Sequence, residues 1–234
     1  ATAGAMLAFR TIAQGTGFKF KLGVDVPETY PFVIYARKAA EKIAQESNGR
    51  LRIEIFPANQ LGSSAELLSQ VRSGAVEMVA LHGATLATLI PVAGINALGF
   101  AFKDYPAVWK AMDGDLGALV RKSFGPFGLH LPASMWDGGF RVVFTKSRQV
   151  SSPEDLKNLK IRVPVSPLYL SIFRALGSAP VAIDVKEVYS SLQTGIADGC
   201  EFPLAGFETL KLFEVQKYCS VTNHIWDGAW PIVN

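Results

Sequence analysis

The stretch "LRIEIFPANQLGSSAELLSQVRSGAVEMVALH" (residues 51–82) contains the repeating unit of the fold. Its first seven residues alternate between apolar and polar side chains, as those of a half-buried strand do. Ser63 and Glu66 then have the spacing of a capping box, which begins a helix, and Gly74 ends that helix. Another apolar run follows at 76–82, so the stretch predicts a β-α-β unit with parallel strands.

The same succession of strand and helix precedes this unit. The sequence "FKFKLGV" (18–24) alternates as a strand does, and a proline-rich turn follows at 27–31. A helix then carries apolar residues on one face, and Asn48 and Gly49 end it. This β-α-β-α-β order predicts an α/β fold with a mostly parallel sheet that helices cover on both faces.

A second set of strands and helices follows in the rest of the chain. Residues 104–124 are predicted as one helix, whereas 84–102 are interpreted as a strand, a loop and the start of a strand. Ser152 and Ser166 each precede a proline and are predicted to begin helices. The other predicted elements are strands at 140–145, 159–164, 179–183, 198–202 and 217–223, and helices at 186–195 and 204–213.

Two α/β sets of similar design predict two lobes that face each other. Lobe I comprises residues 18–139 and 227–234, lobe II comprises 140–226, and residues 1–17 are predicted to be a flexible N-terminal segment. No linker rich in Gly, Ser or Pro separates the lobes near 138–141. We therefore expect strands that cross between the lobes to form the hinge, which suits closure around a ligand.

The composition is typical of a soluble globular protein, with 49% hydrophobic and 18% charged residues. No run of about 20 uninterrupted apolar residues predicts a membrane span. The net charge of +3 comes without a Lys/Arg cluster, which argues against nucleic acid as a partner. The small apolar N-terminal residues resemble the tail of a secretory signal peptide or an expression remnant. Cys200 and Cys219 could form a disulfide, but two buried free thiols are the preferred interpretation.

Motifs typical of catalysis are missing from the sequence. The three histidines, at positions 82, 130 and 224, have no cysteine or acid at the spacing of metal ligands. Neither a G-x-S-x-G nucleophile elbow nor a phosphate-binding glycine loop occurs. These observations favour a binding protein without metal or cofactor over an enzyme. An α/β enzyme that acts on small acids or esters is kept as an alternative.

Arg162 and His82 stand where an α/β sheet binds ligands, at or near the carboxyl ends of its strands. Arg162 lies near the end of a predicted strand, and its guanidinium matches a carboxylate in bidentate geometry. Arg141 stands at the junction of the two lobes. For both arginines a structural ion pair is the alternative. His82 ends a strand before Gly83, and Trp136, beside two glycines, is a candidate pocket wall or a core residue.

Several segments resemble the solute-binding proteins of TRAP transporters, of the dicarboxylate-binding type. They are "IFPANQLGSSAELLSQVRSGAVEM", "GGFRVVFTKSRQVSSPEDLKNLKIRVPVSP", "EVYSSLQTGIADGCEFPL" and "FEVQKYCSVTNH", in the family's order and spacing. The resemblance implies a two-lobed, type II-like periplasmic-binding-protein clamshell. It also implies a monomeric periplasmic protein, not an enzyme, that captures a small organic acid and delivers it to a sodium-coupled membrane permease. A ligand-sensing domain of a regulator or receptor with the same clamshell is the alternative.

The resemblance also implies roles for single residues. Arg162, in "KIRVP", matches the arginine that pairs with the ligand carboxylate, and Arg141 matches a second pocket arginine. His82 matches a pocket position that is often polar. The loop that contains Glu28 and Tyr30 matches a segment bordering the cleft.

The sequence departs from the family pattern at two pocket positions. Phe202 stands in "EFP" where relatives commonly have the asparagine of "ENP", and Val185 replaces an aromatic residue. This predicts a ligand with an aromatic or aliphatic body. Glu201 could hold a metal ion, as an acidic residue does in one branch of the family, but no metal is expected. The chain ends at Asn234, so the C-terminal part of the family fold is not represented.

Overall fold

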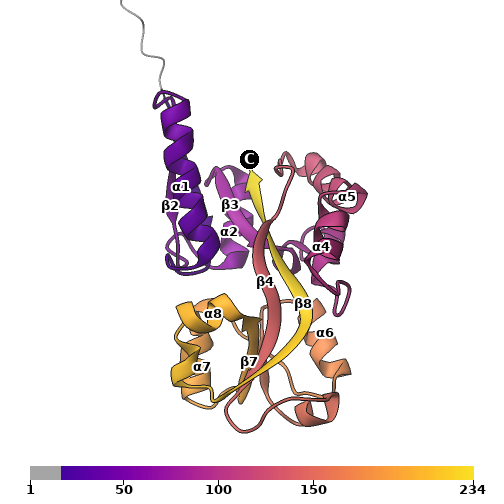
Figure 1. The fold of residues 1–234 in the computed structure, drawn as a ribbon. Coiled ribbons are helices and arrows are strands. Elements are labelled where there is room, and N and C mark those ends of the chain that lie inside the picture. The colour runs from indigo at the N-terminus through magenta and orange to yellow at the C-terminus, as the bar shows by residue number, and fades with distance from the viewer. Residues whose placement is uncertain (1–16) are drawn as a thin grey trace, which may run out of the picture.

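A mixed sheet with the strand order β2-β1-β3-β8-β4-β7-β5-β6 organises the computed structural model, which describes residues 17–234 (Figure 1). Apart from Gly17, the predicted flexible segment at 1–17 lies outside the described residues. The strands are β1 (Phe18–Val24), β2 (Leu51–Phe56), β3 (Met78–His82), β4 (Trp136–Thr145), β5 (Ile161–Val163), β6 (Val181–Ala182), β7 (Gly199–Pro203) and β8 (Tyr218–Val233).

Helices flank the sheet, as the predicted α/β class requires. They are α1 (Pro31–Glu46), α2 (Ser64–Ser73), α3 (Gly83–Leu86), α4 (Tyr105–Met112), α5 (Asp115–Phe124), α6 (Pro167–Ala175), α7 (Val188–Gln193) and α8 (Leu204–Thr209). Short 3-10 helices occupy Pro91–Ala97, Gly125–Phe127, Pro153–Leu156, Val185–Glu187 and Leu212–Glu214.

The outer strands of the sheet are parallel and the central ones are antiparallel. β1 runs parallel to β2 and β3 at one end, and β5 runs parallel to β6 and β7 at the other. Between these groups β8 pairs antiparallel with β3 and β4, and β4 pairs antiparallel with β7. The mixed, mostly parallel sheet of the predicted fold class is thus confirmed, with the antiparallel pairs confined to the strands that connect its two ends.

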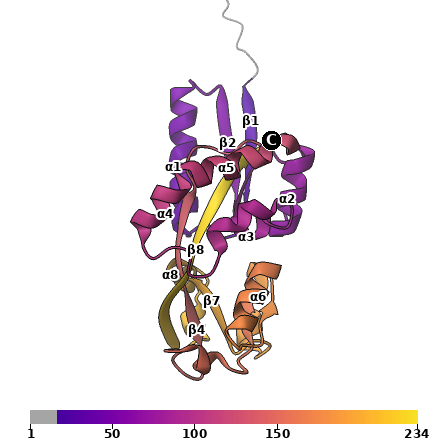
Figure 2. The same ribbon diagram turned by 90° about the vertical axis from the view of Figure 1, so that its right-hand side faces the viewer.

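Two long strands, β4 and β8, pass through both parts of the molecule. In Figure 1 the part with α1, α2, α4 and α5 lies above, and the part with α6, α7 and α8 lies below; Figure 2 shows the same division from the side. The predicted lobe boundaries at 139/140 and 226/227 fall inside β4 and β8. They stay a prediction, because the chain is continuous strand at both points.

The predicted strand at 217–223 is much too short. β8 continues to Val233 over 16 residues, and most of its second half is buried. His224 and Asp227 interrupt the apolar pattern of that half, because their side chains belong to a buried network of charged groups and not to an exposed face. Because these buried side chains are polar, hydrophobic periodicity did not predict the continuation of the strand beyond residue 223.

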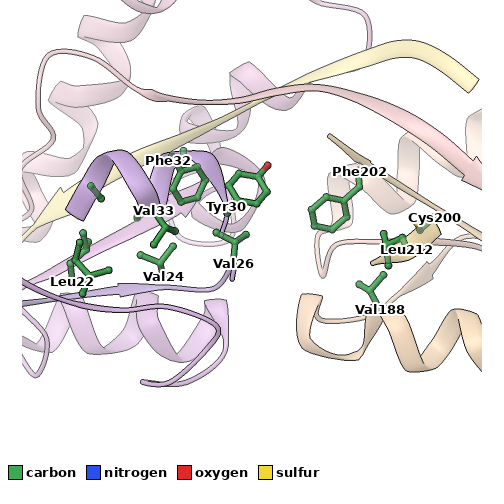
Figure 3. Close-up of a cluster of buried hydrophobic side chains, with 14 of the residues drawn as sticks. Leu22, Val24, Val26, Tyr30, Phe32, Val33, Val188, Cys200, Phe202 and Leu212 are labelled. Carbon is green, nitrogen blue, oxygen red and sulfur yellow. The ribbon is translucent and has the colours of Figure 1, made fainter. Parts of the chain in front are cut away.

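Three buried clusters of apolar side chains form the core. One lies around α2, α4 and α5 with Trp226 and Trp230, and another lies around β5 and α6. The third includes residues of β1 and α1 together with residues of β7 and α7. Figure 3 shows this third cluster as two groups of side chains, with Tyr30 and Phe202 at the ends that face each other.

Other local predictions differ from the structure in informative ways. Residues 84–102 contain α3 and the 3-10 helix that Pro91 begins, in place of the expected strands. The single helix expected at 104–124 is divided into α4 and α5, because Gly114 adopts an extended conformation before α5. Cys200 and Cys219 are both free, as preferred, but Cys219 is exposed and not buried.

Helix starts follow the predicted chemistry at Ser63 but not at Ser166. Ser63 and Glu66 form the predicted reciprocal capping box at the start of α2. Ser166 precedes α6 as expected, yet its side chain makes no capping hydrogen bond. Pro167 at the first helical position removes one of the amide donors at that end, so α6 can begin without the cap.

Removal of the Ser63 cap should destabilise the protein. We expect Ser63→Ala to lower the free energy of unfolding by about 1 kcal/mol, because the amide of Glu66 loses its acceptor. Urea denaturation measures the change. Ser73→Ala is the matched control, since it removes a serine from the other end of α2; an equal loss in both variants would show that the cap has no special role.

Candidate functional site

A cleft of about 450 Å³ lies where the two parts of the molecule meet. Residues 25–88 form one side, here called the N-terminal wall, and residues 162–202 form the other, here called the C-terminal wall. Arg141 and Asp227, on the crossing strands β4 and β8, also line the cleft. Five predicted site residues are among the lining residues: His82, Arg141, Arg162, Val185 and Phe202.

Other hollows lack this concentration of predicted site residues. A hollow of about 640 Å³ beside α1 and β2 is lined by residues such as Lys19, Arg37 and Glu41. It contains none of the predicted site residues. The charged groups that line it stand mainly on the surface, where water already solvates them, so the cleft between the walls is the better candidate for ligand binding.

Arg162 is a buried cation that has no carboxylate partner within the described residues 17–234. It is the middle residue of β5 and only 2% exposed, because Ile161 and Val163 on either side of it belong to the core. Its Nε donates to the carbonyl oxygen of Ile183 at 2.9 Å, but Nη1 has no partner among residues 17–234. Burial lowers the pKa of Arg162 to about 10, although the charge of Glu201 opposes this shift. The edge ion pair considered as an alternative does not form, so the guanidinium is available for an anion.

Arg141, by contrast, is held between two acidic side chains. Its Nε and Nη2 bind the carboxylate of Glu201, with Nη2 at 2.8 Å from Oε1, and its Nη1 binds Oδ2 of Asp227. Burial acts to lower the pKa of Arg141, but Asp227 and Glu201 outweigh it and raise that pKa well above its ordinary value. The structural ion pair predicted as the alternative is therefore present, although Arg141 also lines the cleft.

The ion pair extends into a buried network that joins four strands. Nδ1 of His82 lies 3.0 Å from Oδ1 of Asp227, and Nε2 of His224 lies 3.3 Å from Oε2 of Glu201. Burial acts to lower the pKa of His82, but the charge of Asp227 prevails and raises it. For Asp227, burial acts to raise the pKa, while Arg141 and His82 together lower it to about 2. Sequence reasoning missed Asp227 altogether and considered Glu201 only as a metal ligand.

Phe202 lies against both arginines. Its ring centroid is 5.1 Å from the guanidinium carbon of Arg141 and 5.6 Å from that of Arg162. The side chain is only 5% exposed, and Gly206 makes this position possible, because a Cβ there would lie 2.0 Å from the ring. Both guanidinium groups thus lie within reach of the electron-rich face of the ring, and the ring presents little apolar surface to a ligand.

Tyr169 of α6 completes this arrangement and was also missed. Its ring centroid lies 5.1 Å from the guanidinium carbon of Arg141, and its side chain is fully buried. Burial, the largest cause, raises the pKa of the Tyr169 hydroxyl well above its ordinary value. The hydroxyl is therefore neutral at physiological pH. In the sequence it stood within the apolar face of α6, where nothing distinguished it from a core residue.

The N-terminal wall is rich in hydroxyl groups and contains a third buried carboxylate. Asp25 directly follows β1, and its Oδ2 accepts a hydrogen bond of 2.6 Å from the hydroxyl of Ser64. Thr85 and Thr88 line the same wall. These residues follow the carboxyl ends of β1 and β3, where the rule for open α/β sheets places ligands, so the rule could have identified them.

Three predicted site residues do not line the cleft. Glu28 is exposed and lies 2.8 Å from Nε of Arg37. Tyr30 is buried and donates its hydroxyl hydrogen to the carbonyl oxygen of Gly138 at 3.2 Å. Trp136 packs against an aromatic ring of α1. Tyr30 and Trp136 thus connect α1 to β4, and a direct ligand contact for any of the three stays a prediction.

Residues 17–234 contain neither a cluster of metal ligands nor a helix that could cross a membrane. No group of three or more His, Cys, Asp or Glu side chains is placed to hold a metal ion within this range. No helix in the same range has the length and apolar character to cross a membrane.

The chain is similar to solute-binding proteins over nearly its whole length. The family described as "Bacterial extracellular solute-binding protein, family 7" matches residues 22–234. The 2,3-diketo-L-gulonate-binding periplasmic protein YiaO of Escherichia coli is 31% identical over 92% of this chain. The chain spans 65% of that relative's length and 39% of the length of another curated relative.

Solved structures of TRAP periplasmic solute-binding proteins have the same two-lobed fold. One, from Sulfurospirillum deleyianum with bound succinate, has a TM-score of 0.87 and 28% identity over 92% of this chain and 69% of its own. Another, the sugar acid binding protein DctPAm of Advenella mimigardefordensis with galactonate, has a TM-score of 0.89 and 26% identity. It is matched over 94% of this chain and 70% of its own.

The ion pair of Asp227 should make folding stability dependent on pH in the acid range. The pKa of Asp227 is about 2 in the folded chain against an ordinary 3.8. The contribution of this ion pair to the free energy of unfolding is therefore fully present above pH 3.8 and is lost as the pH falls through about 2. We expect Asp227→Asn to flatten the decrease in unfolding free energy over this window, as measured by urea denaturation. Asp113→Asn, which changes an exposed residue, should keep the wild-type slope. A wild-type slope in Asp227→Asn would contradict the assignment.

Proposed function

We propose that this chain, which belongs to family 7 of the bacterial extracellular solute-binding proteins, binds a small organic acid in the cleft between its two walls. Arg162 pairs with the ligand carboxylate in bidentate geometry. The protein works in the periplasm as a monomer, catalyses no reaction, and delivers its ligand to the sodium-coupled permease of a TRAP transporter.

The unpaired guanidinium of Arg162 carries this proposal. A buried charge without a partner is costly, and the cost is removed when an anion with matching hydrogen-bond acceptors arrives. The Nε of Arg162 is already bonded to Ile183, which orients the planar group, while Nη1 has no acceptor in the described part of the chain. A carboxylate that uses the remaining donors converts an unfavourable buried charge into a charge-assisted pair.

The proteins of similar sequence and structure support a carboxylic acid as ligand. Succinate and galactonate, the molecules bound in two similar structures, both carry a carboxylate. The curated relative of Escherichia coli is named for binding 2,3-diketo-L-gulonate in the periplasm. The acids differ in length and in hydroxyl content, so they support the class of ligand and not one compound.

Closure of the two walls would follow from this arrangement. Arg162 belongs to the C-terminal wall, whereas His82 and Asp25 belong to the N-terminal wall, and β4 and β8 connect them. A ligand that contacts both walls binds the closed form more tightly than the open form and therefore shifts the population towards it. Exclusion of water from the closed cleft then strengthens the ion pair with Arg162.

Replacement of Arg162 should greatly weaken ligand binding. We expect Arg162→Ala to cost about 2–5 kcal/mol of binding free energy, because the ligand carboxylate would be buried without its partner. Isothermal titration calorimetry measures this with whichever of succinate, galactonate or glucuronate binds the wild type most tightly. Arg174→Ala, in the exposed last turn of α6, is the control. Equal affinities for wild type and Arg162→Ala would refute the proposed role.

Replacement of Phe202 should weaken ligand binding through the arginines that its ring contacts. We expect Phe202→Leu to weaken binding of the same acid about 3- to 10-fold, because loss of the aromatic ring leaves Arg162 less firmly oriented. The substitution keeps an apolar side chain in the core, so the effect should appear in the dissociation rate as well as in the affinity. Phe213→Leu, at a half-exposed ring outside the cleft, is the control. Tighter binding of hydroxylated acids by Phe202→Leu would instead indicate that Phe202 acts as an apolar wall.

A further inference from the structure

The two walls of the cleft carry opposite uncompensated charges. On the C-terminal wall, Arg162 has no carboxylate at ion-pair distance among residues 17–234. On the N-terminal wall, Asp25 is 6% exposed and, within the same range, has no Lys, Arg or His at ion-pair distance. Only one of its oxygens is bonded, to the hydroxyl of Ser64, and Oδ1 has no partner within the described chain.

We propose, building on the function proposed above, that Asp25 makes the cleft selective for monocarboxylic acids that carry hydroxyl groups at the end remote from the carboxylate. Arg162 takes the carboxylate, and the free oxygen of Asp25 accepts a hydrogen bond from a ligand hydroxyl on the opposite wall. Dicarboxylates of the same length are rejected, because their second carboxylate would be placed against Asp25.

Among the residues of the N-terminal wall that line the cleft, no cation is free to accept a second carboxylate. The only histidine that lines the wall, His82, lies 3.0 Å from Asp227, so this carboxylate already compensates any positive charge on its ring. Arg141 is likewise compensated by Glu201 and Asp227. A second carboxylate would therefore meet the negative charge of Asp25 with no partner of its own, and such like-charge contact costs several kcal/mol, roughly a hundredfold or more in affinity.

Acidic side chains of the protein already occupy part of the start of α2. The backbone N–H and hydroxyl of Ser63 both donate to Oε2 of Glu66, at 2.6 and 2.8 Å. The hydroxyl of Ser64 donates to Asp25. A ligand carboxylate at this helix end would therefore meet the negative charges of Glu66 and Asp25.

The remaining groups of the N-terminal wall favour a hydroxyl over an ammonium group. Thr85, Thr88 and Ser63 line the cleft with hydroxyls. Those of Thr88 and Ser63 already donate to the carbonyl oxygen of Thr85 and to Glu66, whereas that of Thr85 can donate or accept. A ligand hydroxyl can pair with Asp25 as a donor and with Thr85 in either role, whereas an ammonium group can only donate. We therefore assign a hydroxylated acid, and an amino acid is the competing outcome of the test.

Five six-carbon acids separate these possibilities: gluconate, glucarate, hexanoate, adipate and 6-aminohexanoate. Gluconate and glucarate share their hydroxyl groups and differ in whether the far end is a hydroxymethyl or a carboxylate. Hexanoate and adipate repeat this comparison without hydroxyls, and 6-aminohexanoate places an ammonium group at the far end. Calorimetry on the wild-type chain should show gluconate binding at least about tenfold more tightly than glucarate, hexanoate and 6-aminohexanoate.

The variant Asp25→Asn tests whether Asp25 is the cause. It keeps the shape and the bond to Ser64 but removes the charge, so the gap between gluconate and glucarate should shrink to less than about threefold. Asp113→Asn makes the same change in net charge at an exposed position and should keep the wild-type gap. If Asp25→Asn fails to fold, the comparison of gluconate with glucarate on the wild type still decides the proposal.

The outcomes distinguish this inference from the proposed function. If glucarate or adipate binds the wild type as tightly as gluconate, and Arg162→Ala abolishes that binding, the inference is wrong and the function stands. Tightest binding by hexanoate or 6-aminohexanoate likewise overturns it in favour of an apolar or an amino acid ligand. If none of the acids binds, nor succinate, galactonate or glucuronate, the proposed function fails together with this inference.

Discussion

The buried guanidinium of Arg141 is the point on which the arrangement of both walls depends. It extends from β4, binds Glu201 of β7 and Asp227 of β8, and through Asp227 it is connected to His82 at the end of β3. A buried ion pair adds little net stability over apolar packing, since desolvation opposes its attraction, but breaking one leaves an unpaired charge that costs several kcal/mol. The four strands must therefore keep the register that brings these side chains together, and this register also sets the position of the cleft.

The backbone around Arg141 is adapted to this contact. The pairing of β4 with β8 shifts in register on both sides of Arg141, and such irregularities re-aim a side chain out of the regular pleat. At Gly138 a Cβ would lie 2.3 Å from the carbonyl oxygen of Asp227, so only glycine allows the two strands to approach there. The crossing strands thus combine a hinge position with the fixed placement of the charged network.

The contrast between the two arginines explains how the cleft can bind an anion without losing its structure. Arg141 and Arg162 contact the same ring, that of Phe202, yet the first is paired with two carboxylates and the second with none. The compensated arginine holds the strands, and the uncompensated one is left for a ligand. Phe202 brings the two cations to a common neighbour that attracts both, which reduces the cost of placing like charges close together.

Much of the fold and part of the site could be predicted from the sequence, because the deciding signals are local. Alternation at 18–24 and 51–57, the Ser63 capping box and the succession of strand and helix depend on neighbouring residues only, and they determined the α/β class. The position of Arg162 between two core residues near a strand end singled it out as a candidate. The tertiary structure alone decided which arginine is free, that Phe202 lies beneath both, and that Tyr169 and Asp227 face the cleft. These facts depend on the partner that each buried charge finds across strands far apart in the chain, and no local pattern records that partner.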